Sequence, residues 1–200
     1  RIQCVNHFKQ IGLAIMNYES TYNSLPLAYT PNWTGDPREG PCPGVTVDGN
    51  PPNGLRQHSI HTFLLPFMER GDLYDGFDFS YNYIEKRPNP PVNNREIAFT
   101  EIPEFQCPSA PARPGEYATD YAVAVDMLET SFCDLKNSGL VTPRNLEHLV
   151  GMMSDTPVSF RKVSDGLSNT LMFFEDAGRP DHYIKGGEID PAEPRVPNGW

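Results

Sequence analysis

Residues 1–22, RIQCVNHFKQIGLAIMNYESTY, constrain the fold most, because they hold the strongest helical periodicity in the chain. Their apolar side chains recur at alternating steps of four and three residues, which places them along one stripe of an α-helix. The stripe consists of Cys4, Phe8, Ile11, Ile15, Tyr18 and Tyr22, and Val5, Leu13 and Met16 flank it. A helix with one apolar stripe must bury it, so the rest of the chain is expected to supply the surface on which this helix lies.

The sequence also indicates where this helix begins and ends. Asn23, Ser24 and Pro26 favour turns and predict that the helix ends after Tyr22. Gly12 costs a helix about 1 kcal/mol relative to alanine, which predicts a closely packed partner over that position. Because the chain starts at Arg1 with neither an initiator methionine nor a cap residue, we expect a helix that continues upstream in the full gene product.

Composition places the chain in the α+β class as one domain of residues 1–200. It holds 21 prolines and 16 glycines, so long loops must connect short elements. The net charge of -10 repels phosphate backbones and argues against a nucleic-acid partner. The expected order is a helix at 1–22, a long loop at 25–54, an α+β head at 55–177 and a C-terminal loop at 178–200.

Within the head, two helical regions are expected. For residues 58–79 the sequence predicts a strand-like segment or a single helical turn, followed by a helix that begins at Pro66 and ends at Gly71. Residues 92–100 have helical composition, and Pro103 closes that segment. Strands are expected at 104–107, 117–125, 158–163 and 170–175. The last two flank the turn sequence SDGLSN, so they predict an antiparallel hairpin.

The four cysteines favour disulfides. Their spacing contains no C-x-x-C pair, and a structural zinc site is therefore the weaker interpretation. Prolines beside two of them indicate rigid loops that are typical of cross-linked extracytoplasmic domains. The candidates are Cys4, Cys42, Cys107 and Cys133, and three pairings stay open.

Candidate ligand sites are few. Loop and aromatic residues suited to a glycan or other solute are Trp33, Tyr74, Tyr81 and Tyr83. The SDGLSN turn could hold calcium through Asp165, Ser168 and Asn169, although a plain hydrogen-bonded turn is the favoured interpretation. His58 and His61 could share zinc on one helical face, but no third ligand is evident in sequence. No other cofactor is expected.

No catalytic motif is present, so the sequence predicts a protein that is not an enzyme. Serine, zinc-protease and nucleotide-binding signatures are all missing. Carboxylates at predicted strand ends could still support glycoside hydrolysis, and they are Asp120, Asp126, Glu175 and Asp176. A hydrolase is thus the third alternative, behind an assembly protein and a solute-binding module.

Ordered motifs along the whole chain resemble a large planctomycete family of pilin-like secreted proteins. They are Gln3-Cys4, Asn6, the run Phe8 to Ala14, Asn17-Tyr18, Leu25-Pro26, Leu64 to Glu69, Leu73-Tyr74, Phe105 to Ser109, Asp120-Tyr121, Asp165 to Thr170 and Glu175. The family carries a prepilin-type cleavage and methylation segment followed by a domain of unknown function. It has also been catalogued as a solute-binding family.

The resemblance implies a pilin-like fold, in which the N-terminal helix packs on an antiparallel sheet with long loop insertions. It also implies an extracytoplasmic head on an upstream transmembrane helix, with copies of itself or related subunits as partners for assembly or display. The family has a C-terminal H-x9-DG motif that these 200 residues lack, and it offers no catalytic residues to carry over. The stretch 131–156 matches none of its motifs.

Overall fold

A computed structural model describes residues 2–29, 58–83, 85–89, 91–110, 117–125, 135, 137–139, 151–154 and 157–178, and the backbone of 38–39 and 46–47. The α-helices are α1 (Ile2–Tyr22), α2 (Ile60–Leu64), α3 (Gly71–Gly76) and α4 (Asn94–Ala98). The 3-10 helices are η1 (Leu65–Met68), η2 (Pro103–Phe105), η4 (Phe160–Lys162) and η5 (Leu167–Asn169). The strands form antiparallel pairs, β1 (Arg38–Glu39) with β2 (Thr46–Val47), β3 (Lys86–Pro88) with β4 (Pro91–Asn93), and β5 (Tyr121–Val123) with β6 (Phe173–Glu175).

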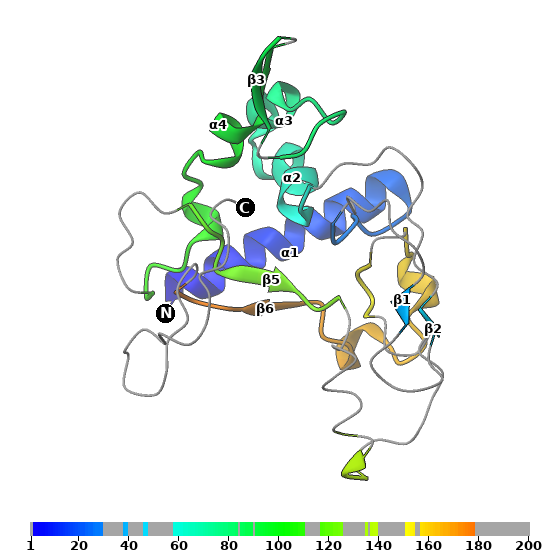
Figure 1. The fold of residues 1–200 in the computed structure, drawn as a ribbon. Coiled ribbons are helices and arrows are strands. Elements are labelled where there is room, and N and C mark those ends of the chain that lie inside the picture. Colours follow the sequence, from blue (N-terminus) through cyan, green and yellow to red (C-terminus); the bar gives the residue numbers. More distant parts are fainter. Residues whose placement is uncertain are drawn as a thin grey trace.

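Helix α1 is the longest described element, and it runs through the middle of the view in Figure 1. In that view α2, α3 and α4 lie above α1, whereas β5 and β6 lie below its first half. The predicted helix is confirmed, and Ile11 and Ile15 of the predicted stripe are fully buried. The helix ends as predicted, because Asn23 adopts a left-handed φ of 54° and its N–H donates to the Glu19 carbonyl at 2.7 Å.

The surface under α1 is mostly helical rather than a broad sheet. Helix α1 contacts α2, η1 and η2, and aromatic contacts join its first turns to the β5–β6 pair. The Phe8 ring centroid lies 5.3 Å from that of Tyr121, in an edge-on arrangement. Farther along the helix, Tyr18 lies 5.5 Å from Phe67 of η1. The chain is therefore α+β, and each described sheet has two strands.

The predicted hairpin of 158–163 with 170–175 is wrong. Strand β6 pairs instead with β5, with Tyr121 opposite Glu175 and Val123 opposite Phe173. The first predicted strand cannot join a sheet because η4 occupies it: the N–H of Lys162 donates to the Ser159 carbonyl at 2.9 Å. The short-strand prediction at 104–107 is also wrong, since the 3-10 helix η2 occupies the first half of that segment and no strand follows it there.

Residues 58–79 are more helical than expected. Helix α2 already begins at Ile60, and Pro66 then enters η1 in its first turn, where the missing N–H does no harm. Glu69 ends η1 with a left-handed φ of 59°. Gly71 begins α3 rather than ending the helical region, which corrects the sequence-based prediction.

Candidate functional site

A disulfide fixes one end of α1 to the segment after η2. Cys4 and Cys107 are bonded, with their Cα atoms 5.0 Å apart and 103 residues between them in sequence. Both cysteines are buried. The disulfide prediction is confirmed for this pair, whereas Cys42 and Cys133 lie outside the described residues. Closing so long a loop strongly restricts the unfolded chain. The chain-entropy model predicts that this restriction stabilises the folded state by roughly 4 to 5 kcal/mol.

Asp120 stabilises the same region through buried hydrogen bonds. Its carboxylate is buried and accepts the N–H of Cys107 at 2.7 Å and the N–H of Gly178 at 2.9 Å. Its own backbone N–H donates to the Phe105 carbonyl at 2.8 Å. Because these backbone groups occupy both carboxylate oxygens, Asp120 acts as a structural acceptor for the disulfide segment and the chain after β6.

Tyr121 connects the disulfide end of α1 to the β5–β6 pair. Its hydroxyl donates to the Cys4 carbonyl at 3.3 Å, and its ring is fully buried. Burial, helped by the nearby charges of Glu175 and Asp120, raises the pKa of Tyr121 to about 12. The tyrosine therefore stays neutral and keeps its donor across the physiological pH range.

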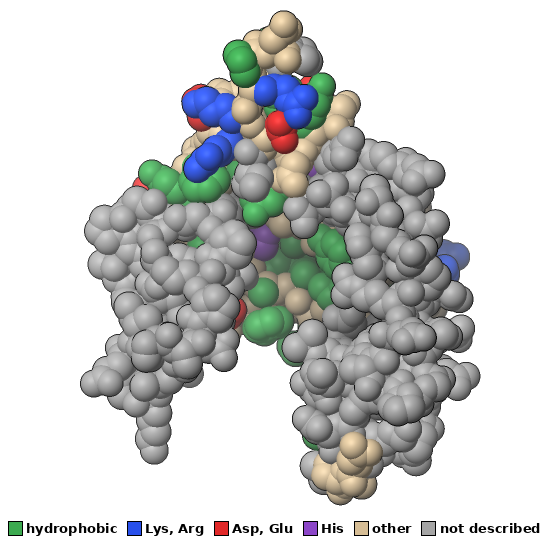
Figure 2. All heavy atoms as spheres, viewed as in Figure 1, with side chains coloured by type: hydrophobic (Ala, Val, Ile, Leu, Met, Phe, Trp, Pro, Cys, Tyr) green, Lys and Arg blue, Asp and Glu red, His purple; other side chains and the backbone are tan. Residues whose placement is uncertain are grey.

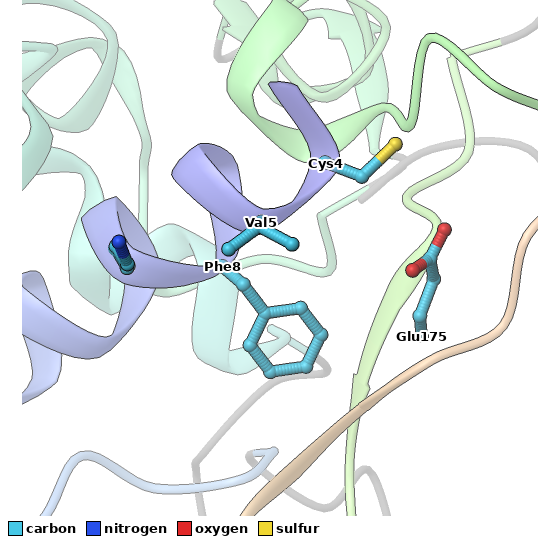
Figure 3. Close-up of a pocket in the computed structure, with 5 residues that line it drawn as sticks. Cys4, Val5, Phe8 and Glu175 are labelled. Atoms are coloured by element: carbon cyan, nitrogen blue, oxygen red, sulfur yellow. The ribbon is translucent and has the colours of Figure 1, made fainter. Parts of the chain in front are cut away.

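A pocket opens beside this disulfide, between α1 and β6. It has a volume of about 340 Å³ and is lined by Cys4, Val5, Phe8, Lys9 and Glu175. Figure 3 shows Val5 and Phe8 on the helix, and the Glu175 carboxylate directed toward Cys4 from the strand across the gap. The lining is apolar apart from one ammonium and one carboxylate, so the pocket suits a small solute that carries apolar and charged groups.

The face of α1 turned away from the core is also apolar. The exposed fractions of Ile2, Val5, Leu13 and Met16 are 80%, 49%, 62% and 51%. With 100° per residue these four positions fall within an arc of about 80°, so they form one stripe, here called the outer stripe. Sequence reasoning treated Val5, Leu13 and Met16 only as flanks of the buried stripe, although their own spacing could have revealed a second one.

Gly12 lies beside the outer stripe. No described atom lies within 4 Å of the position that a Cβ would occupy. The packing partner that the sequence predicted over Gly12 is therefore not supplied by the part of the chain that the structure describes. A glycine in an exposed helix face leaves room for another backbone to approach closely.

The predicted aromatic ligand residues belong to the chain around α3. Tyr74 lies with its ring centroid 5.0 Å from that of Phe79, and the Arg87 guanidinium lies 4.5 Å from the centre of the Tyr81 ring. Tyr83 is partly buried, which raises its pKa. None of these three lines the pocket beside the disulfide. Trp33 lies outside the described residues.

The end of the molecule that carries β3 and α4 gathers Lys and Arg side chains (Figure 2). Acidic neighbours pair with them: Lys86 Nζ lies 2.5 Å from a Glu96 carboxylate oxygen, and an Arg87 nitrogen lies 2.5 Å from one of Glu85. The pairing leaves little net positive charge for an anionic partner. Because water screens pairs this exposed, they contribute little to the stability of the fold.

The SDGLSN segment forms a turn that satisfies its own hydrogen bonds. The Asn169 amide donates to the Asp165 carbonyl at 3.1 Å, and the Thr170 hydroxyl donates to the Gly166 carbonyl at 3.1 Å. Gly166 has a φ of 84°, a conformation that glycine adopts without strain. Asp165, Ser168 and Asn169 are exposed, and calcium at these residues stays a prediction.

The two histidines weighed as a zinc pair have separate partners. His58 Nε2 donates to the Tyr81 carbonyl at 2.9 Å, whereas His61 Nε2 lies 3.3 Å from the Thr119 hydroxyl. Both are buried among aromatic rings: His58 beside Phe77 and Phe79, and His61 beside Phe105 and Phe173. These contacts make both rings part of the core.

His58 should make the stability of the domain depend on pH. Burial lowers the pKa of His58 below its ordinary value of 6.5, an effect that outweighs the hydrogen bond to Tyr81. Below pH 6.5 the unfolded chain therefore binds a proton more readily than the folded one, and the free energy of unfolding falls as pH falls. One such group can contribute a slope of at most about 1.4 kcal/mol per pH unit.

Urea unfolding between pH 8 and pH 5 measures this slope. The His58→Phe variant keeps an aromatic ring beside Phe77 and Phe79 but cannot titrate, so its stability should change less over the same range. Equal slopes in the two proteins would show that His58 does not drive the acid sensitivity.

Among the helices that the structure describes, none combines the length and the apolar composition that a membrane span requires. No curated protein and no solved structure matches the chain. A family model, SBP_bac_10, described as "Protein of unknown function (DUF1559)", matches residues 1–199. Because this match covers almost the entire chain, the protein belongs to the DUF1559 family.

Proposed function

We propose that this chain is the extracytoplasmic head of a pilin-like surface protein that works by assembly or display rather than by catalysis. The observation that carries the proposal is the outer stripe of α1. One face of the helix is buried under the chain's own core, and the opposite face exposes Ile2, Val5, Leu13 and Met16 to solvent. A single exposed apolar residue is ordinary, but four on one face of one helix are typical of a partner surface.

The partner that fits this stripe is another helix. Helices associate through rows of apolar side chains, and a small residue within the row lets the two backbones approach closely. Gly12 supplies such a position next to Leu13 and Met16. Lys9 lies on the same face, where its four-carbon stem extends the apolar surface while its ammonium reaches water. The matching helix on a second copy is therefore the proposed partner.

Sedimentation and membrane fractionation test this function. Two forms should be expressed: residues 1–200, and the full gene product with whatever segment precedes residue 1. We expect the longer form to be membrane-bound or filamentous. Residues 1–200 should remain a soluble monomer at dilute concentration, because no membrane then concentrates the outer stripes of different copies. A longer form that stays a soluble monomer and binds a sugar tightly would overturn the proposal in favour of solute binding.

Solute binding is the second candidate, and the pocket beside Cys4 favours it. Its apolar lining carries Lys9 and Glu175, which suit a small ligand with a carboxylate and an ammonium or hydroxyl groups. Calorimetric titration with amino acids and oligosaccharides tests this reading, with Lys9→Met and Glu175→Gln as pocket variants. Tight binding that both variants weaken would support this function, and no heat from any ligand would exclude these two classes.

A further inference from the structure

Three potential metal ligands meet at the pocket beside the disulfide. The sulfurs of Cys4 and Cys107 and a carboxylate oxygen of Glu175 all lie within 4.8 Å of one another. They come from α1, from the segment after η2 and from β6, so three parts of the fold converge there. Figure 3 shows the Glu175 carboxylate extending toward Cys4. No hydrogen bond or ion pair from another described residue reaches that carboxylate.

We propose that Cys4, Cys107 and Glu175 form a redox-gated site for a thiolate-preferring divalent metal, such as Zn²⁺ or Cd²⁺. In the disulfide the two sulfurs are bonded to each other and offer no thiolate, so the oxidised protein has no site. A dithiol reductant opens it: the dithiol gives up two electrons and two protons and becomes a disulfide, and the Cys4–Cys107 bond breaks into two thiols. The metal then displaces the two thiol protons.

The ligand set suits this class of metal. Zinc binds thiolate sulfur at about 2.3 Å and carboxylate oxygen at about 2.0 to 2.2 Å, so ligand atoms in a tetrahedral site lie about 3.5 to 3.8 Å apart. The three atoms already lie within 4.8 Å, so side-chain rotations bring them to those separations once the sulfurs part. Three protein ligands leave a fourth position, which water can reach through the pocket.

The surroundings support bound thiolates. The Ser109 hydroxyl lies 3.6 Å from Cys4 Sγ and can donate to it, since neither a disulfide sulfur nor a thiolate carries a proton. Donors of this kind orient and stabilise metal ligands. A bound metal would also keep α1 tied to the segment after η2 when the disulfide is reduced, so metal should raise the melting temperature of the reduced protein.

Cadmium titration tests the site, because thiolate-to-cadmium charge transfer absorbs in the ultraviolet. The protein is reduced with a dithiol, freed of it without air, and titrated. We expect reduced wild type to bind one more Cd²⁺ than a reduced Cys4→Ser/Cys107→Ser chain, which keeps Cys42 and Cys133 as a background. Glu175→Gln should weaken that binding at least about tenfold, the low end of the losses seen when even supporting residues are removed.

Asp176→Asn is the matched control, because it makes the same change of charge at the next residue without touching the three ligands. It should bind as wild type does, and the oxidised protein should show no charge-transfer band. Melting curves of the oxidised variants check that they fold. Equal binding by wild type and the double serine variant, unchanged affinity in Glu175→Gln, or no binding after reduction would each overturn the site.

Discussion

Replacing Ile11 with aspartate should lower the free energy of unfolding by at least about 4 kcal/mol, a large share of the 5 to 15 kcal/mol that stabilises typical domains. Ile11 is 1% exposed and lies on the buried stripe of α1. Truncation of such a side chain alone costs about 2 to 5 kcal/mol, and an unpaired buried carboxylate adds a desolvation penalty. Denaturant unfolding of residues 1–200 measures the loss.

Leu13→Asp is the matched control for Ile11→Asp. It places the same residue on the same helix, two positions away, at a side chain that is 62% exposed. At this exposed position only the lower helix propensity of aspartate should matter. The free energy of unfolding should therefore fall by less than about 1 kcal/mol. If the two variants lost equal stability, the assignment of one buried and one outer stripe to α1 would be wrong.

Asp120→Ala should lower the free energy of unfolding by about 2 to 6 kcal/mol. Removal of the carboxylate leaves the buried N–H groups of Cys107 and Gly178 without their acceptor, and each such loss costs about 1 to 3 kcal/mol. Asp120→Asn keeps one acceptor oxygen and should lose less. Thermal and denaturant unfolding of the oxidised proteins, in which the disulfide stays closed, compare the three.

Asp165→Ala is the control for Asp120→Ala, because it removes a carboxylate that is exposed to solvent. The Asn169 amide donates to the backbone carbonyl of Asp165, so the SDGLSN turn should survive the substitution and stability should change by no more than about 0.5 kcal/mol. An Asp120→Ala variant within 1 kcal/mol of wild type would contradict the role assigned to the buried carboxylate.

Local patterns predicted the long helix well. The stripe over residues 1–22 and the turn residues after it define α1 almost to the residue, because a helix satisfies its backbone within its own segment. The hairpin prediction failed for the opposite reason. Strand β6 pairs with β5, some 50 residues earlier in the chain, and a strand of three residues carries too little alternation to identify a distant partner.

The site was predictable only in part. The cysteines and their neighbouring prolines indicated disulfides, yet sequence left three pairings open because pairing depends on the folded distance. Nothing in sequence places Glu175 beside Cys4, since that proximity follows from the β5–β6 register and from the contact of Phe8 with Tyr121. The spacing of the outer stripe is visible in the sequence. When a helix is apolar on two faces, however, its sequence pattern is hard to distinguish from that of one wide apolar face.

Photocrosslinking of the full gene product tests the proposed assembly most directly. A photoreactive amino acid replaces Leu13 on the outer stripe or, as control, Gln3, which is exposed and lies about 80° around α1 from Leu13. We predict that illumination of cells yields covalent dimers joined through position 13 in much greater amounts than through position 3, and that Met16→Glu removes them. Equal yields at both positions, or no adduct between copies at position 13, would contradict assembly through α1.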